Sequence, residues 1–464
     1  SNSYRGNRKR GSSARSNNPA IMSGYRVLHR EFPPPTDKSK SLGDVCLPWW
    51  TDVKFVPRRR RPSSSSLPSP SDDRRILLTS GLVAANGVSP TSEEKKGCGG
   101  MRGVVRIYSA SPPTSSAAPP RLPSGDGDED EDAPAASPPL SASALTMTHI
   151  SDLTAPPQTV GEFCFGAVDC ALLHGHNGAP SLIVAAVSPS GRLCFWSFDD
   201  VSDEVRLSTS SVTCVTVDGA TGTSVALDPA PSLATPLTAV GTRNGSVALV
   251  RPSGTDTAVV VAARVPSSST GARVADDCIC SLAWSLCGTA LAAGQRDGRV
   301  SLWAVGRGPG GERPLLSAVG KDVRHSGAKG QAVRAIAFAG SEGGALLVGT
   351  DDGCVRLYDV GGATGEEGVR WSTPIQTGTF WAGNGRGVVG RGWVTAIDCA
   401  PDGRRFVASY ADRNVKVWDL GTRQCLHSFD GHEDIVWSAV FDDTGERIAS
   451  CGLDGILQIY KAEE

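Results

Sequence analysis

The sequence predicts an all-β protein, a β-propeller in which seven four-stranded blades close into a ring. Three observations support this fold class: a short turn-and-strand segment recurs seven times, further runs of strand length precede each copy, and the last copy lacks a fourth strand. The chain has 464 residues with 54 glycines and 31 prolines, which favours many turns over long helices. Internal repetition of one β unit is typical of propellers.

Each recurring segment is a turn, usually ending in glycine, followed by a strand in which apolar and polar residues alternate. Glycine and asparagine allow the positive φ of a tight turn, and the alternation is that of a half-buried strand. The segments are MRGVVRIY (101–108), PSGRLCFW (189–196), RNGSVALV (243–250), RDGRVSLW (296–303), DDGCVRLY (351–358), ADRNVKVW (411–418) and LDGILQIY (453–460).

Two more β-rich runs precede each segment, and an outer one follows where the chain is long enough. In the sixth unit they are WVTAIDCA (393–400), RFVASY (405–410) and CLHSFD (425–430). Trp418 and Tyr460 close consecutive units 42 residues apart, within the period of about 40–45 residues of four-stranded propeller blades.

The seventh unit reaches Glu464 without an outer strand. A blade left with an open edge would expose unpaired backbone groups and leave the ring unlatched. The run YRVLHREF (25–32) is the candidate for the missing strand. We therefore expect residues 25–32 to pair with the strand that ends at Tyr460, although this run could also be a disordered tail.

The expected domain organisation is a disordered basic tail (1–21) and one propeller (22–464). Low-complexity stretches predict disordered insertions at 57–75, which is basic and rich in Ser and Pro, and at 109–145, which contains the acidic run DGDEDED. They are interpreted as solvated loops, with partner docking as the alternative. The expected blades are approximately 44–108, 150–198, 205–262, 275–320, 328–376, 390–430, and 432–464 together with 25–32.

The balance of charges and the placement of the cysteines limit the kinds of protein that this chain can be. The 46 basic and 48 acidic residues nearly balance, which argues against extended wrapping of nucleic acid. The thirteen cysteines lie mostly in apolar runs and are interpreted as reduced thiols, which indicates cytosol or nucleus. Cys278 and Cys280 form the nearest pair but lack a second ligand pair, so no metal site is predicted.

No catalytic motif is recognised. The chain has no phosphate-binding glycine loop, no HExxH and no GxSxG. No catalytic residue, cofactor or metal ligand is therefore assigned. Because propellers can hold a metal or carboxylates in the central channel, a propeller hydrolase stays open as an alternative.

Several polar and aromatic residues at the turns are interpreted as architectural. A buried network of His, Ser and Asp with a residue at the end of the third strand can hold a blade together. In the seventh blade these residues are His432, Ser450, Asp454 and Tyr460, and in the sixth blade they are Asp412 and Trp418.

The repeat resembles the WD-repeat family, with an intact Trp-Asp and an intact Gly-His. The last two units are most similar to the WD-repeat subunits of the superkiller complex, over about 15% of the chain; the earlier units match only generic WD repeats, and the long insertions depart from that compact family. The matching residues are 415–419, 421–423, Cys425, His427, Phe429, His432, Asp434, Val436, Trp437, Ile459 and Tyr460.

The resemblance implies a non-catalytic adaptor in the nucleus and cytoplasm. Its implied partners are the tetratricopeptide scaffold and helicase of the superkiller complex in messenger RNA decay, or subunits of the polymerase-associated-factor complex in transcription elongation. No direct contact with nucleic acid or membrane is expected. A ubiquitin-ligase substrate receptor is the alternative, although such receptors often carry Trp-Asp-x-Arg and Arg423 lies five residues after Trp418.

Aromatic and acidic residues before or within the first strands are the expected partner-binding residues, because loops on that face surround the channel and tryptophan dominates interface energetics. For Trp50 and Trp437, packing in the core is an equal alternative. The candidates are Trp49, Trp50, Trp393, Asp434 and Trp437.

Overall fold

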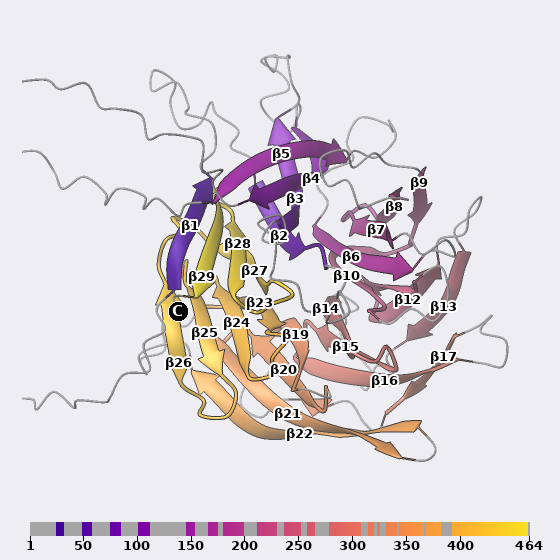
Figure 1. Cartoon of the computed structure of the whole chain (residues 1–464). Helices are drawn as coiled ribbons and strands as arrows, with labels where there is room; N and C mark the ends of the chain where they lie inside the picture. Colours follow the sequence, from indigo (N-terminus) through magenta and orange to yellow (C-terminus); the bar gives the residue numbers. More distant parts are fainter. Residues whose placement is uncertain are drawn as a thin grey trace, which may run out of the picture.

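The computed structural model is an all-β ring of seven sheets arranged around a central axis, as the sequence predicts (Figure 1). Within the described residues every regular element is a strand, and no helix there is long and apolar enough to cross a membrane. The structure describes residues 25–31, 49–57, 75–84, 101–111, 145–153, 166–174, 180–198, 211–229, 236–251, 258–264, 278–307, 314–319, 323–324, 331–340, 343–365, 368–381 and 392–462.

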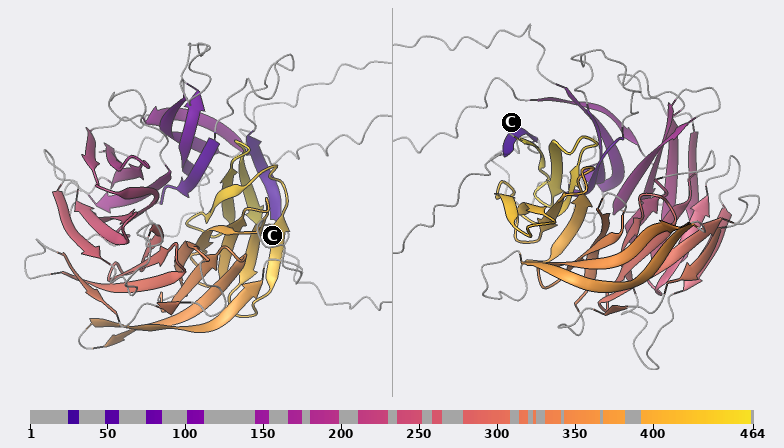
Figure 2. Two further views of the ribbon diagram at one scale, coloured as in Figure 1. Left: turned by 180° about the vertical axis from the view of Figure 1, so that it is seen from behind. Right: turned by 60° about the horizontal axis from the view of Figure 1, so that its bottom comes forward.

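Each sheet is one blade, and its strands are antiparallel and follow chain order from the channel outward in blades 1 to 6 (Figures 1 and 2). Blade 1 contains β2 (Trp49–Phe55), β3 (Arg75–Ala84), β4 (Met101–Ser111) and β5 (Thr146–Leu153). Blade 2 contains β6 (Ala167–His174), β7 (Pro180–Val187), β8 (Arg192–Phe198) and β9 (Ser211–Thr216). Blade 3 contains β10 (Ala220–Leu227), β11 (Thr238–Thr242), β12 (Ser246–Arg251) and β13 (Ala258–Arg264).

The remaining four blades continue around the ring. Blade 4 contains β14 (Ile279–Trp284), β15 (Ala290–Gln295), β16 (Arg299–Arg307), β17 (Pro314–Ala318) and the short β18 (Val323–Arg324). Blade 5 contains β19 (Val333–Ala339), β20 (Ala345–Thr350), β21 (Cys354–Gly365) and β22 (Gly368–Trp381). Blade 6 contains β23 (Val394–Cys399), β24 (Arg405–Tyr410), β25 (Val415–Asp419) and β26 (Cys425–Phe429). Blade 7 contains β27 (Val436–Phe441), β28 (Arg447–Gly452), β29 (Leu457–Ala462) and β1 (Tyr25–Glu31).

The turns between the second and third strands have the backbone that their glycines predict. Gly245, Gly298, Gly353 and Gly455 have φ between 72° and 87°, a region that costs glycine little. In blade 6 the corresponding residue is Arg413, with φ of 77°, and not the expected Asn414. This blade therefore tolerates a left-handed residue with a side chain.

The outer strands of blades 1 and 2 lie further along the chain than the expected ranges. β5 pairs with β4 and completes blade 1, so this blade extends well beyond 108 and blade 2 begins at β6. Likewise β9 pairs with β8 in blade 2 and does not open blade 3. Both strands are largely solvent-exposed, and a strand that buries little shows no apolar alternation by which to recognise it.

Blade 5 extends beyond its expected end at 376, because β22 continues to Trp381. β21 and β22 continue as a hairpin whose pairing reaches Gly365 and Gly368. In blade 4, β18 pairs with the start of β16 beyond the expected end at 320. Glycine-rich composition does not prevent strand pairing when the partner strand is adjacent in the chain.

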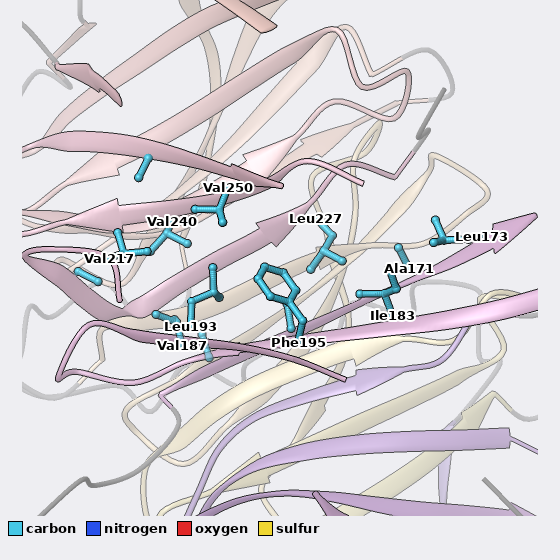
Figure 3. Packing of buried hydrophobic residues seen from close by; sticks show 14 residues of the cluster. Ala171, Leu173, Ile183, Val187, Leu193, Phe195, Val217, Leu227, Val240 and Val250 are labelled. Atoms are coloured by element: carbon cyan, nitrogen blue, oxygen red, sulfur yellow. The ribbon is translucent and has the colours of Figure 1, made fainter. Parts of the chain in front are cut away.

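The hydrophobic core lies between the blades and is divided into seven clusters around the ring. One cluster joins blades 2 and 3 through Phe195, Leu193, Val240 and Val250 (Figure 3). Neighbouring sheets pack so closely that a Cβ at Gly294 in β15 would overlap Val333 of the next blade. Each blade is thus stabilised mainly by its two neighbours, so the ring needs to be closed.

Closure occurs as predicted, through an N-terminal strand. β1 pairs antiparallel with β29, with Val27 opposite Tyr460, and becomes the outer strand of blade 7 (Figure 1). Phe32, the tail 1–21, most of the insertion 57–75 (residues 58–74) and of the insertion 109–145 (residues 112–144) lie outside the described residues. Residues 109–111 belong to β4.

Side-chain bonds join blades 1 and 7 where the ring closes. Arg75 Nε lies 3.0 Å from Asp442 Oδ2, and both side chains are almost completely buried. Burial favours protonation of Asp442, but hydrogen bonds from Thr444 and the charge of Arg75 hold its pKa below the ordinary value. The last blade is therefore joined to the first by charge as well as by the shared strand.

Candidate functional site

The central channel contains a cavity of about 420 Å³ lined by the first strands of all seven blades. Because these strands are the inner edges of their sheets, side chains on them converge on the axis. Six channel-lining side chains, from six different blades, form a ring of mixed chemistry: Thr51, Thr223, Cys280, Arg334, Thr395 and Trp437.

This ring lies at one end of the channel. We call the face of the propeller at this end the turn face. Here the residue that follows each second strand reaches the residue that precedes a first strand. The amide of Arg296 donates to the Cys278 carbonyl (2.8 Å), Ala411 to Trp393 (2.9 Å) and Leu453 to Ile435 (2.9 Å). The turns between second and third strands therefore surround the same opening as the ring.

Trp393 lies on the turn face in a stacked cluster with an arginine. The Arg334 guanidinium carbon is 4.4 Å from the centre of the Trp393 ring, and Arg334 also forms an ion pair with Asp351. Trp393 is half-buried. Arg334 lines the cavity and Trp393 stacks against it, so a planar cation backed by an aromatic ring can bind a peptide that presents carboxylates or carbonyls.

Trp437 and Asp434 lie in the adjacent sector of the same face. Trp437 lines the cavity and is half-buried. Asp434 is exposed, and its Oδ1 accepts a hydrogen bond from the Ile435 amide at 2.8 Å. The structure thus brings Trp393, Trp437 and Asp434 to one face, accessible from solvent.

Trp50 does not belong with these residues, although the sequence places it among the partner-binding candidates. Its side chain is 2% exposed, and its Nε1 donates to the Gly455 carbonyl at 3.1 Å. Because a first strand faces both the channel and the neighbouring blade, Trp50 packs between blades 1 and 7. The side chain of Trp49 lies outside the described part of the chain, and its backbone pairs with Leu82.

The network of His432, Ser450 and Asp454 in blade 7 lies just behind the turn face. His432 Nδ1 is 2.9 Å from Asp454 Oδ2, and His432 Nε2 is 2.8 Å from Ser450 Oγ. Burial alone would raise the pKa of Asp454, but hydrogen bonds from His432 and from two backbone amides lower it. The carboxylate therefore stays charged and anchors the loop that carries Asp434.

The other architectural residues serve separate contacts. Tyr460 stacks on Phe429 of blade 6 (4.0 Å between ring centres) and donates to Gln458 Oε1 (2.5 Å). Trp418 packs between Phe380 and Phe406. Asp412 accepts a hydrogen bond from the Asn414 amide at 3.3 Å within its own turn.

Aspartates on three first strands make a feature that the sequence reasoning missed. Each accepts a hydrogen bond from a backbone amide of the next blade: Asp52 from Val168 (3.1 Å), Asp169 from Leu227 (2.8 Å) and Asp398 from Phe441 (2.7 Å). An aspartate inside an otherwise apolar strand, as in AVDCAL and TAIDCA, is the signal that could have revealed them.

Lys54 lies among these aspartates and lines the channel. Burial lowers the pKa of Lys54, but the charges of Asp52, Asp169 and Asp398 outweigh burial and raise it above the ordinary value. Burial raises the pKa of Asp169 and Asp398, and Lys54 partly offsets that effect. Because the aspartates are engaged in blade-to-blade bonds, this cluster is structural.

The chemistry of the channel suits recognition. Over the residues that the structure describes, no group of three or more His, Cys, Asp or Glu side chains is placed to hold a metal ion. The turn-face ring offers one cation, three hydroxyls, one thiol and one indole, which together can contact the backbone and side chains of an inserted peptide.

Comparison with known families identifies the repeat. Residues 269–304, 386–419 and 423–461 match the family model described as "WD domain, G-beta repeat". These segments are WD40 repeats. The third begins in β26, the outer strand of blade 6, and continues through the first three strands of blade 7. This third match therefore spans two blades, whereas the first two contain strands of blade 4 and of blade 6 only.

Curated relatives of the chain are distant and matched in part. The chain is 24% identical over 186 residues to a component of "Chromatin assembly factor 1" from Mus musculus, covering 38% of this chain and 30% of that protein. It is 27% identical over 192 residues to "Ribosome biogenesis protein WDR12 homolog" of Chlamydomonas reinhardtii, covering 40% and 37%. It is 35% identical over 68 residues to "U3 snoRNP-associated protein-like EMB2271" of Arabidopsis thaliana, covering 15% and 14%. The matched regions thus span little more than a third of these relatives at most.

Proposed function

We propose that this protein is a non-catalytic scaffold that binds a segment of a partner protein on the turn face of its propeller. The observation that carries the proposal is the placement of Trp437 and Arg334 on the wall of one open cavity, with Trp393 stacked against Arg334. A rigid ring that presents aromatic and arginine side chains can bind a peptide without first ordering itself. Tryptophan and arginine are also the residues most enriched in binding hot spots.

More narrowly, we propose membership in a nuclear and cytoplasmic complex of RNA metabolism, the superkiller complex or the polymerase-associated-factor complex. The support is the resemblance of residues 415–437 and 459–460 to superkiller WD-repeat subunits. The relatives named for chromatin assembly and ribosome biogenesis favour a second candidate, a scaffold of a nuclear assembly complex.

Affinity purification of the tagged full chain followed by mass spectrometry separates these candidates. Recovery of a helicase together with a tetratricopeptide subunit supports the superkiller complex. Recovery of elongation factors supports the polymerase-associated-factor complex. Histone-assembly or ribosome-assembly subunits would support the nuclear alternative. A chain that elutes alone from native extracts would contradict the scaffold proposal.

Replacing Trp437 by alanine tests the proposed surface once a partner is in hand. Loss of a central tryptophan at an interface costs on the order of 2 kcal/mol, which is about a 30-fold rise in Kd. Because Trp437 is only half-buried, thermal unfolding of the variant should stay close to that of the wild type. Titration calorimetry with the purified partner segment measures the change.

Leu286→Ala is the matched control. Leu286 is the most exposed large apolar side chain among the described residues, at 59%, and it lies between the first and second strands of blade 4, opposite the turn face. This variant should bind as the wild type does. Equal affinity of Trp437→Ala and the wild type would show that the partner binds elsewhere on the ring.

A further inference from the structure

Two cysteines of blade 2 lie directly opposite each other on neighbouring strands. Cys194 belongs to β8 and Cys214 to β9, and the two residues are register partners. The register between these strands is unbroken, so no bulge turns either side chain away. Side chains of directly opposite residues lie on the same face of an antiparallel sheet, and the two thiols therefore face each other.

This placement meets the main geometric requirement of a disulfide. Directly opposite residues of an antiparallel pair have Cα atoms about 4.5 or 5.5 Å apart, depending on their place in the hydrogen-bonding pattern. Both spacings lie inside the range of about 4.4–6.8 Å that disulfides span. An S–S bond between Cys194 and Cys214 therefore requires rotation of the two side chains but no slip of either strand.

Over the residues that the structure describes, no other two cysteines are placed in this way. Each of the other cysteines with a register partner lies opposite a residue of another type: Cys170 opposite Val184, Cys354 opposite Trp381, Cys399 opposite Phe406, Cys425 opposite Trp418, and Cys451 opposite Ser438 and Leu457. Direct opposition of two thiols is thus a particular feature of blade 2.

Cys170 shows why this opposition matters. Its side chain packs against the same hydrophobic cluster as Cys194 and Cys214. However, Cys170 lies in β6, and β7 separates β6 from β8. Alternate strands of a sheet are roughly 9–10 Å apart, which is too far for a disulfide. Cys170 therefore provides an internal control for the pair.

The two opposed thiols differ in their access to solvent. Cys194 is fully buried in the cluster between blades 1 and 2, whereas Cys214 is half-buried on the outer strand of blade 2. The hydrogen bond with Cys214, together with burial, raises the pKa of Cys194 well above the ordinary value and outweighs the opposing effect of Arg192. A small oxidant therefore reacts first at Cys214.

We propose that Cys194 and Cys214 form an oxidation site at which hydrogen peroxide produces an intrachain disulfide. The Cys214 thiolate attacks one peroxide oxygen, the O–O bond breaks, and Cys214 becomes a sulfenic acid while hydroxide leaves and takes up a proton. The Cys194 sulfur then attacks the sulfenic sulfur. The S–S bond forms, and the hydroxide released from Cys214 takes the Cys194 proton and leaves as water. Two thiols and one peroxide thus give one disulfide and two molecules of water.

The disulfide fastens the outer strand of blade 2 to its neighbour. β9 is largely exposed, and residues 199–210 separate it from β8 in the chain. A covalent bond restricts the detachment of such a strand, so amide hydrogen exchange in β9 should slow severalfold on oxidation. Equal slowing in a Cys194→Ala variant would show that another oxidation causes it.

The test is mass spectrometry of the full chain after treatment with hydrogen peroxide. Free thiols are blocked by an alkylating reagent, and the chain is digested without reductant. We expect a peptide pair joined through Cys194 and Cys214, which disappears when excess dithiothreitol is added before alkylation. Oxidation of the exposed Cys287 without any joined Cys194–Cys214 peptide would overturn the proposal.

Variants and dimedone, a reagent that traps sulfenic acids, separate the roles of the two thiols. In the wild type Cys214 should be labelled little, because Cys194 consumes its sulfenic acid. Cys194→Ala keeps apolar packing and removes the second thiol, so labelling of Cys214 should rise severalfold. Equal labelling of Cys214 in both proteins would contradict the proposed role of Cys194.

Two further variants complete the comparison. Cys214→Ala should abolish the disulfide and leave Cys194 reduced, because the Cys194 thiol is fully buried. Cys170→Ala is the matched control, since Cys170 packs against the same cluster without a cysteine opposite it. This variant should form the Cys194–Cys214 disulfide as the wild type does, and loss of the disulfide there would count against direct opposition as its basis.

Discussion

Trp50 and Trp437 begin in sequence as equivalent tryptophans of first strands, yet they have opposite roles. Trp50 is enclosed by blades 1 and 7 and donates to the Gly455 carbonyl. Trp437 is half-buried in the channel wall. Residue type alone could not distinguish them, because one side of a first strand faces the neighbouring blade and the other faces the channel, and a tryptophan can occupy either side.

Replacing Trp50 by phenylalanine should destabilise the protein without affecting the turn face. The indole hydrogen bond is lost, leaving the buried Gly455 carbonyl without this donor, at a cost of about 1–3 kcal/mol plus a smaller packing loss. Urea unfolding followed by circular dichroism measures the free energy of unfolding. Trp50→Ala should lose more, about 3–5 kcal/mol.

Partner affinity provides the contrast for the Trp50 variants. Below the unfolding transition, Trp50→Phe should bind the partner as the wild type does, while Trp437→Ala should not. A Trp50→Phe variant of unchanged stability and reduced affinity would return Trp50 to the set of partner-binding residues.

The three inner strands of a blade are easier to recognise from the amino-acid sequence than its outer strand. Inner strands such as β8 and β28 are buried along nearly their whole length, so their composition marks them. Outer strands such as β5 and β9 are half-exposed, polar and separated from their partners by long connections. Only pairing with a neighbour determines where they lie.

β1 is the outer strand on which ring closure depends. Its pairing with β29 runs from Tyr25 opposite Ala462 to Glu31 opposite Leu457. We predict that Arg26→Pro combined with Val27→Pro lowers the melting temperature and promotes self-association. In neighbouring residues the amides alternate in direction, so one proline must remove a donor that faces β29.

The matched control is Arg26→Thr combined with Val27→Thr, which changes the same side chains and keeps both amides. Differential scanning fluorimetry and light scattering compare the two. If the proline variant had the same melting temperature as the threonine variant and stayed monomeric, β1 would not be required for closure.

For the whole molecule, closure joins residues almost four hundred positions apart. The buried Arg75–Asp442 ion pair, the Ser438–Asp52 hydrogen bond (2.7 Å) and the Trp50–Gly455 hydrogen bond all cross between blades 1 and 7. Bringing residues this far apart together carries a large loop-closure entropy, which is typical of slowly folding proteins.

Asp442→Asn should destabilise the fold at neutral pH, because it removes the nearer carboxylate of the buried Arg75 guanidinium and leaves Asp443, 3.8 Å away, as its counter-charge. The cost should therefore lie below the roughly 3–5 kcal/mol of a buried charge left with no partner. The asparagine oxygen can still accept the bonds that Thr444 and Arg447 make to Oδ1, so the turn itself is preserved. Replacing both partners, with Arg75→Met and Asp442→Leu, is a less specific test. It removes the buried charges, but it also removes the carboxylate that accepts the hydrogen bonds of the turn.

The effect of Asp442→Asn should depend on pH. Because folding lowers the pKa of Asp442, its contribution is fully present above the unfolded pKa of about 3.9 and is lost as pH falls through the lower folded value. The stability gap between wild type and variant should therefore be large at pH 7 and narrow toward pH 3. Urea titrations at several pH values measure it, and a gap independent of pH would exclude the ion pair as its cause.

The sequence by itself determined the number of blades, the three inner strands of each repeat and the closing role of residues 25–31, because burial and turn chemistry are local properties of the chain. The tertiary structure alone decided which tryptophan lines the channel and which is buried between blades. It also decided where the exposed outer strands pair, and that Asp52, Asp169 and Asp398 bond to the next blade. These features depend on distances between blades, which only the closed ring sets.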